Sequence, residues 1–337
     1  MNKRTLVIIN STAARARRAW PEIKSKLAAH DIRFDDYATR HAGDATTRVR
    51  AALKEGYQTI AVVGGDGTLS EAAAGFFEFD EKSCSSDKLP AQVSVEAALA
   101  ILPAGTGDDF ARGLTGRRES LEHWIKTLVA HCRRDDSKAA RAVDVIYAKA
   151  QSVEGEFICL NATTIGIGAE VATYVGAQGR ITQALPGEAR FVSAALRALA
   201  RWRERRTRIK IVESNAARSS LESTVEIQCA SNLIAIANGV YAGGGMMFAP
   251  EARVDDGLMD VLLACDGLTR AGILRELPRI RRGAHLSNPR VRVMRATSVS
   301  IETDGGEDAL MIEADGNVSG HTPAEFRIIP GALRIVL

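Results

Sequence analysis

A short glycine-rich stretch places a carboxylate where a phosphate group could bind. Residues 61–76 read AVVGGDGTLSEAAAGF, so three glycines, an aspartate and a threonine separate an apolar run from an alanine-rich helix. Glycines let backbone N–H groups approach an anion, and a helix N-terminus favours negative charge. The pattern therefore predicts a phosphate-holding loop made of Gly64, Gly65, Gly67 and Thr68.

Asp66 is the unusual residue of this loop, because a bare carboxylate is repelled by phosphates. It becomes useful if Mg²⁺ bridges it to the phosphates, or if it accepts the proton of an attacking hydroxyl. The alternative is that Asp66 only caps the following helix, a common role for aspartate. The loop has neither the GK[ST] ending of a Walker A motif nor GxGxxG spacing. On spacing alone, both interpretations of Asp66 stay open.

A second loop repeats the design. Residues 100–114 read AILPAGTGDDFARGL, an apolar run followed by Gly105-Thr106-Gly107 and a helix. Two such loops on neighbouring strands would face one crevice, which favours phosphate binding over two ordinary turns.

Apolar strands must position both loops. The runs at 5–10, 59–65 and 97–105 show no polar alternation, and helical spacing follows each of them. Such strands, separated by helices, indicate a parallel sheet covered on both faces, which binds ligands at the carboxyl ends of its strands. The polar stretch 79–92 reads as a surface insertion.

The pattern changes after about Arg134. Short strands separated by turn signals follow, with one helical stretch at 187–205, and they predict a mostly β second domain.

Four segments in chain order resemble the diacylglycerol kinase catalytic family, which comprises diacylglycerol, sphingosine and ceramide kinases and their soluble bacterial relatives. The segments are VVGGDGTLSEAAAGF, LPAGTGDDFARGL, NGVYAGGGMMFAPEARVDDGLMDVLL, and ADGNVSG with the final IIPGALRIVL. They are similar to the family's nucleotide loop, its LPxGTxNDFAR and NGxxxGGGxxxxPxAxxxDGxLDV segments, and its closing DGE segment. GGDGT alone also occurs in NAD kinases and phosphofructokinases, but four segments in order favour the lipid kinase branch.

The resemblance implies an NAD kinase/phosphofructokinase-like α/β domain with a parallel sheet, and a mostly antiparallel β-sandwich. We expect the nucleotide-binding domain at residues 1–134 and the β-rich substrate domain at 135–324. A final strand at 325–337 would return to the first domain.

The resemblance also implies an ATP-dependent kinase that uses Mg²⁺. The nucleotide-binding residues would be Thr39, Gly64, Gly65, Asp66, Gly67, Thr68, Glu71, Gly105 and Thr106. A Mg²⁺ in the second domain would be held by the backbone carbonyls of Arg253 and Leu258 and the side chain of Asp256. The paired acids of VDDGLMD suit a hard cation, although solvated aspartates in a β-turn are the alternative.

Two positions depart from the family pattern. The family's Asn in GTxNDF is Asp108, which adds negative charge near the phosphates. The Glu of DGE, assigned as proton acceptor in bacterial relatives, is Asn317, and an amide cannot take up a proton at neutral pH. Asp66 and Asp315 are then the candidate catalytic carboxylates, and Glu313 shares a face with Asp315 if the segment is extended. Phosphoryl transfer depends more on positioning and charge neutralisation than on a base, so activity could be retained, reduced or lost.

Composition sets the expected location. The chain is 46% hydrophobic and 25% charged, as in soluble globular proteins, and its five scattered cysteines fit reduced thiols. No signal peptide and no run of about 18 apolar residues is visible. We therefore expect a cytoplasmic protein.

Two basic clusters suggest a partner. Residues 197–210, which include Trp202, and residues 275–295 suit an anionic lipid interface, and a solvated helix face is the alternative. The net charge of +3 and the absence of a nucleic-acid motif around either cluster argue against nucleic acid. A homodimer is compatible with the sequence.

The sequence thus favours a kinase of lipid metabolism and phospholipid biosynthesis, in peripheral contact with the inner membrane surface. It would phosphorylate a diacylglycerol-like lipid hydroxyl. The alternatives are a kinase of a soluble substrate, as in NAD kinases, and a non-catalytic relative that binds nucleotide or lipid.

Overall fold

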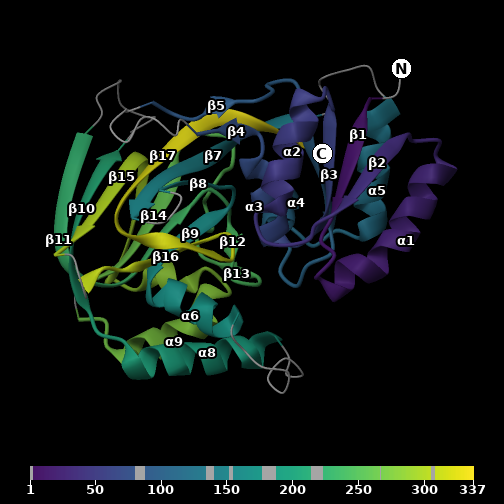
Figure 1. Cartoon of the computed structure of the whole chain (residues 1–337). Coiled ribbons are helices and arrows are strands. Elements are labelled where there is room, and N and C mark those ends of the chain that lie inside the picture. Colours follow the sequence, from purple (N-terminus) through teal and green to yellow (C-terminus); the bar gives the residue numbers. More distant parts are fainter. Residues whose placement is uncertain are drawn as a thin grey trace. The chain divides into compact units, whose positions relative to one another are not determined.

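The computed structural model describes residues 3–79, 88–133, 140–151, 155–176, 187–213, 223–265, 267–304 and 308–337 (Figure 1). The chain forms two compact units, Met1–Val145 with Ile329–Leu337, and Ile146–Ile328. It passes between them within strand β7 (Ala140–Gln151) and within strand β17 (Asn317–Val336).

The first unit is built on a sheet whose neighbouring strands pair in parallel. Its order is β2 (Phe34–Ala38), β1 (Thr5–Ile9), β3 (Thr59–Gly64), β6 (Ala98–Pro103) and the end of β17. Strands β1 and β3 are buried along their whole length, which explains their uninterrupted apolar sequence. Strand β2 forms the edge and leaves Asp35 and Asp36 exposed. Its sequence therefore lacks the apolar run from which the other strands were predicted.

Helices cover both faces of this sheet. They are α1 (Ala14–Ala29), α2 (Asp44–Lys54), α3 (Asp66–Ala74), α4 (Asp109–Thr115) and α5 (Leu121–Arg133). Helix α1 contacts α5 and helix α2 contacts α3, and the two pairs lie on opposite sides of the sheet (Figure 1). A short hairpin, β4 (Phe77–Glu78) with β5 (Ala91–Gln92), flanks the expected surface insertion, of which residues 80–87 lie outside the described part.

The second unit consists mainly of antiparallel strands. Their order is β10 (Arg205–Glu213), β15 (Val291–Thr303), β14 (Met259–Cys265), β11 (Ser223–Ala237), β9 (Ala162–Gly166), β16 (Met311–Ala314) and the beginning of β17. Additional pairings of β10 with β11 and of β15 with β17 close the strands on themselves, which limits the number of unpaired edges. Strand β8 (Glu156–Cys159) pairs antiparallel with β7, and β12 (Tyr241–Ala242) pairs with β13 (Met246–Met247).

Helices of the second unit pack their apolar faces onto these strands. They are α6 (Ile167–Gly176), α8 (Gly187–Arg201), α9 (Arg270–Ile280) and the short 3₁₀ helix η2 (Ala284–Ser287). Helix α8 buries Ala194, Ala198 and Leu199 in one apolar cluster with strand residues such as Ile209. The helix expected at 187–205 ends at Arg201 because the chain enters β10 at Arg205.

The expected helix-and-sheet N-terminal part and strand-rich C-terminal part are both confirmed. Among the helices that the structure describes, none combines the length and the apolar character needed to cross a bilayer.

Candidate active site

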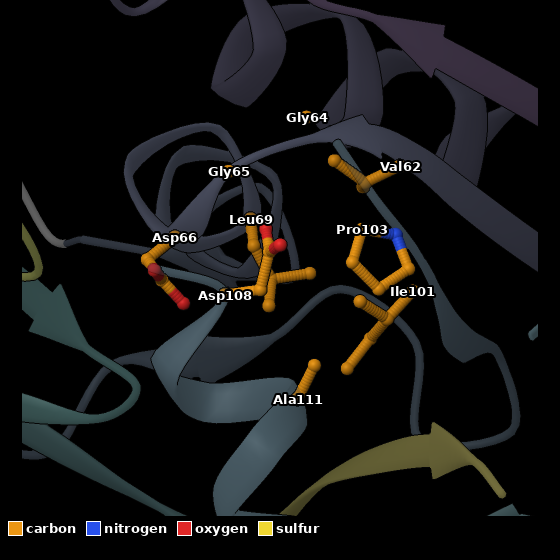
Figure 2. Close-up of a pocket in the computed structure, with 9 residues that line it drawn as sticks. All are labelled: Val62, Gly64, Gly65, Asp66, Leu69, Ile101, Pro103, Asp108 and Ala111. Atoms are coloured by element: carbon orange, nitrogen blue, oxygen red, sulfur yellow. The ribbon is translucent and has the colours of Figure 1, made fainter. Parts of the chain in front are cut away.

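Both glycine loops line one small pocket in the first unit (Figure 2). Strands β3 and β6 are adjacent and parallel, with Gly64 opposite Pro103, so the loops leave the sheet at the same edge. The pocket lining includes Gly65 and Asp66 from the first loop and Asp108 from the second. The sheet thus brings together two segments that lie about 40 residues apart in the sequence.

The two loops touch through their backbones at Gly65 and Gly105. A Cβ atom on Gly105 would lie 2.5 Å from the Gly65 Cα, and one on Gly65 would lie 3.1 Å from the Gly105 Cα. Gly64 is restricted as well, because its Cβ would lie 2.8 Å from the Cβ of Thr68. The glycines are needed here for close approach of two chain segments as well as for access of a ligand.

Asp66 joins the two loops. It is the first residue of α3, yet its carboxylate accepts the backbone N–H groups of Asp109 and Phe110 in α4, each at 3.1 Å. The aspartate therefore caps the neighbouring helix and not its own. Burial, followed by the charge of Asp109, raises the pKa of Asp66 to about 6 despite the two backbone hydrogen bonds.

Polar residues from β1, β2 and α3 continue the same edge of the sheet. Asn10 Nδ2 donates to Thr68 Oγ1 at 2.7 Å, and the Ser11 hydroxyl donates to the carbonyl of Thr39. Glu71 accepts the N–H of Gly43 at 3.1 Å. Thr39, Thr68 and Glu71 are thus each held by a separate hydrogen bond, to Ser11, Asn10 and Gly43 respectively, and their role in binding nucleotide stays a prediction.

Sequence reasoning missed two arginines beside the second loop. Arg15 Nη1 donates to the carbonyl of Gly105 at 2.7 Å. Arg118 Nη2 forms an ion pair with Asp108 Oδ2 at 2.6 Å and lies 3.4 Å from the carbonyl oxygen of Thr106. A basic residue just inside α1 was the only available signal for Arg15, and nothing in the sequence assigned Arg118 to Asp108.

Comparison with known proteins identifies this architecture. The diacylglycerol kinase catalytic domain model matches residues 4–146, and the model of the YegS C-terminal NAD kinase beta sandwich-like domain matches residues 161–337. The chain belongs to the diacylglycerol kinase family with the YegS-type C-terminal domain. The resemblance stated from the sequence is therefore confirmed.

Similar proteins span nearly the whole chain. A "Probable lipid kinase YegS-like" protein of Pseudomonas aeruginosa PAO1 is 30% identical over 94% of this chain and 89% of its own. A "Diacylglycerol kinase" of Staphylococcus carnosus is 26% identical over 97% of this chain and 92% of its own. A crystal structure of a diacylglycerol kinase from Bacillus anthracis strain Sterne has a TM-score of 0.61 at 19% identity, covers 99% of this chain and 96% of that one, and supports the fold alone.

Asn317 stands where the resemblance implies an acidic residue, and two buried carboxylates, Glu313 and Asp315, precede it. Asp315 accepts the backbone N–H groups of Leu160, Asn161 and Ala162 at 2.6, 3.0 and 3.1 Å, and its backbone has φ +47°. The Cys159 thiol also lies 3.4 Å from its Oδ1. This carboxylate anchors the turn between β8 and β9, which is a structural role that the sequence did not reveal.

Glu313 has a different environment from Asp315. Thr164 donates its hydroxyl to Glu313 Oε2 at 2.7 Å, and the N–H of Gly316 donates to Oε1. Burial raises the pKa of Glu313 to about 7, although both hydrogen bonds oppose the shift. Glu313 is therefore a carboxyl of this unit that can exchange a proton near neutral pH, as is the buried Asp260 of β14, whose pKa is raised by burial to about 6.

The expected cation turn is already partly neutralised. Asp256 accepts the N–H of Leu258 at 3.2 Å and is ion-paired with Arg295, while Arg253 lies 3.7 Å from a carboxylate oxygen of Asp255. In the described part of the chain, no group of three or more His, Cys, Asp or Glu side chains is arranged to hold a metal ion. The oxygen donors suit Mg²⁺ chemically, but a cation at Asp256 must share it with Arg295.

The close approach of the loops predicts an ordered set of substitution effects. Gly105→Ala should lower the free energy of unfolding by about 1–3 kcal/mol, because its Cβ meets backbone and the loops must separate. Gly65→Ala should cost less, since its nearest contact is 3.1 Å instead of 2.5 Å. Gly107→Ala is the control within the same loop, because the atoms nearest to its Cβ, at 3.1 to 3.2 Å, belong to the Asp109 side chain and not to the first loop. Urea unfolding measures all three, and equal effects would contradict the contact.

The raised pKa of Glu313 predicts that the free energy of unfolding depends on pH. Between pH 4.5 and about 7 the folded protein keeps a proton that the unfolded chain releases. This stabilisation is complete below pH 4.5 and is lost as the pH rises to about 7. Relative to Glu313→Gln, wild type should lose on the order of 3 kcal/mol across this window.

Urea unfolding of both proteins from pH 4.5 to 7.5 would measure this difference. Glu226→Gln gives the control, because it makes the same substitution at a side chain that is 55% exposed. A constant difference between wild type and Glu313→Gln at every pH would rule out a buried, titrating Glu313.

Proposed function

We propose that this protein is an ATP-dependent lipid kinase that transfers the γ-phosphate of ATP to the hydroxyl of a diacylglycerol-like lipid. The observation that carries the proposal is the backbone contact of Gly65 with Gly105, which merges two glycine loops at one edge of the first unit's sheet. Similar proteins named diacylglycerol kinase support the choice of a lipid substrate. The first unit would bind ATP and the second would bind the lipid.

The nucleotide would contact residues from the strand ends of the first unit. These are Thr39, Gly64, Gly65, Asp66, Gly67, Thr68, Glu71, Gly105 and Thr106. Mg²⁺ would neutralise phosphate charge, and oxygen atoms of Arg253, Asp256 and Leu258 would hold it in the second unit. The oxygen donors of these residues and the family membership of the chain support the nucleotide contacts and the Mg²⁺ site that we propose.

In the proposed reaction the lipid hydroxyl oxygen attacks the γ-phosphorus, ADP leaves, and the hydroxyl proton passes to a carboxylate. Asp66 suits this role better than Asp315. With a pKa of about 6, Asp66 is ionised at neutral pH and can accept a proton. The oxygens of Asp315 already accept three backbone N–H groups and face the Cys159 thiol.

Transfer of labelled phosphate from ATP with Mg²⁺ into a lipid extract in mixed micelles tests the function. The informative variant is Asp66→Asn, because its amide oxygen can still accept one of the two α4 N–H groups, whereas Asp66→Ala would leave both without an acceptor. Wild type should label a lipid, and Asp66→Asn should reduce the rate by at least about 100-fold.

Other outcomes of this assay separate the alternatives. Labelling of a water-soluble acceptor instead of a lipid would favour a soluble-substrate kinase. ATP binding without any transfer would favour a non-catalytic relative. In that case Asn317→Glu, which restores the family's acid, should recover transfer if the missing base is the cause.

The outer face of α8 fits an anionic membrane surface. Val192 and Leu196 are 46% and 49% exposed, one turn apart, and Arg197 and Arg201 lie beside them on the exposed face. In the part of the chain that the structure describes, both arginines contact Tyr174, Arg197 over its ring at 5.3 Å and Arg201 at 3.5 Å from its hydroxyl, and neither forms an ion pair with a carboxylate. The expected contribution of Trp202 is wrong, because this side chain is 3% exposed and lies in the core.

Vesicle binding tests this face. Arg197→Gln/Arg201→Gln should weaken binding to phosphatidylglycerol vesicles about 30-fold, at about 1 kcal/mol for each lost charge. Arg206→Gln/Arg208→Gln removes the same charge from β10, where Arg208 already pairs with Glu226 and Glu302, and should have a smaller effect. Equal losses from both pairs would show that net charge, and not α8, governs binding.

A further inference from the structure

Two charged side chains hold the backbone of the second glycine loop. Asp108 is 6% exposed, and its backbone lies in the left-handed region with φ +52°. Its Oδ1 accepts the N–H of Gly105 at 2.8 Å, while Arg15 donates to the Gly105 carbonyl at 2.7 Å. The conformation of Gly105, and hence its contact with Gly65, depends on these two hydrogen bonds.

The negative charge of Asp108 is unfavourable at this place. Asp66 and Asp108 both line the pocket (Figure 2), and the charges of Asp109 and Asp108 raise the pKa of Asp66. Three carboxylates therefore share the region in which a phosphate would bind. A buried carboxylate without a cationic partner is destabilising, and it also repels an anionic ligand.

Arg118 supplies the compensating charge. Its Nη2 atom lies 2.6 Å from Asp108 Oδ2, and the same nitrogen lies 3.4 Å from the carbonyl oxygen of Thr106. The side chain comes from the turn after α4, where Gly116 has φ +75°. Arg118 is 55% exposed, so it neutralises a buried carboxylate from the rim of the loop.

We infer that Asp108 and Arg118 act as one charge-neutral unit that positions the Gly105–Gly107 loop for an anionic phosphate ligand, with Arg118 as the positioning residue. The inference rests on the proposed nucleotide site. A neutral amide at position 108 could accept the same N–H without any partner. The requirement for Arg118 is thus created by the charge of Asp108, and it disappears when that charge is removed.

A double-mutant cycle tests this dependence with two readouts, the dissociation constant for ATP and urea unfolding without nucleotide. Arg118→Ala should weaken ATP binding about tenfold and lower stability, because Asp108 is left buried and unpaired. Asp108→Asn alone should stay within about twofold of wild type. Arg118→Ala/Asp108→Asn should recover both properties to within about threefold of wild type.

Two neighbouring arginines provide controls. Arg117 is 79% exposed and pairs with Glu119, so Arg117→Ala should change neither readout. Arg15 contacts the same loop without contacting Asp108, so Arg15→Ala should weaken ATP binding, and Asp108→Asn should not rescue it.

Rescue of Arg118→Ala by Asp108→Asn supports the inference. If Arg118 acted only through a contact that does not depend on the Asp108 charge, Asp108→Asn would not restore either property. The inference is overturned if Arg118→Ala binds ATP like wild type, or if Asp108→Asn leaves its defect unchanged. Wild type that binds no ATP would refute the proposed function and the role toward phosphate. The unfolding cycle would still decide whether Arg118 compensates Asp108, because it needs no nucleotide.

Discussion

The backbone contact between Gly65 and Gly105 is the constraint on which the site depends. Any side chain at Gly105 would overlap the Gly65 Cα, so the two loops can meet only through glycine. Parallel pairing of β3 with β6 brings the loops to one edge, and Asp66 then ties the first loop to the start of α4. Because each contact requires the others, a shift of either strand would separate the loops and leave backbone donors of α4 unpaired.

This geometry resolves the question of a carboxylate inside a phosphate-type loop. Asp66 is stabilised by backbone N–H groups and destabilised by burial and by Asp109, and the balance leaves its pKa at about 6. The carboxylate caps α4 in the protein without ligands, yet its pKa is only about one unit below neutral pH. The same carboxylate can therefore cap a helix and take part in catalysis. Because its pKa is already perturbed, a nearby cation or hydroxyl can shift its protonation state.

Sequence patterns predicted the elements that carry a local signal, namely buried apolar strands and glycine-rich loops. The central strands and both glycine loops were visible because β1, β3 and β6 are apolar throughout. The edge strand β2 and helix α2 were missed, since a polar sequence such as FDDYA lacks that signal. The link from Asp66 to α4 and the pairing of Arg118 with Asp108 join separate segments, so no local spacing encodes them. The prediction that Trp202 belongs to an exposed basic cluster was wrong for the opposite reason. Its neighbours in the sequence are exposed, but its own ring is buried.

The second unit shows how environment separates carboxyl groups that are two residues apart. Asp315 receives three backbone N–H groups and lies beside a thiol, so its oxygens are committed to the turn between β8 and β9. Glu313 receives one hydroxyl and one N–H, and burial outweighs them, which moves its pKa to about 7. Asn317, two residues after Asp315, is exposed to solvent and cannot take up a proton. The carboxyl groups whose pKa is raised to about 6 or 7 include Glu313 and the buried Asp260 of β14 in this unit, and Asp66 in the other. Because Glu313 is 8% exposed, a substrate must reach it through a change in its surroundings, whereas Asp66 already lines a pocket. The accessible carboxylate of the glycine loop is therefore the stronger candidate for chemistry.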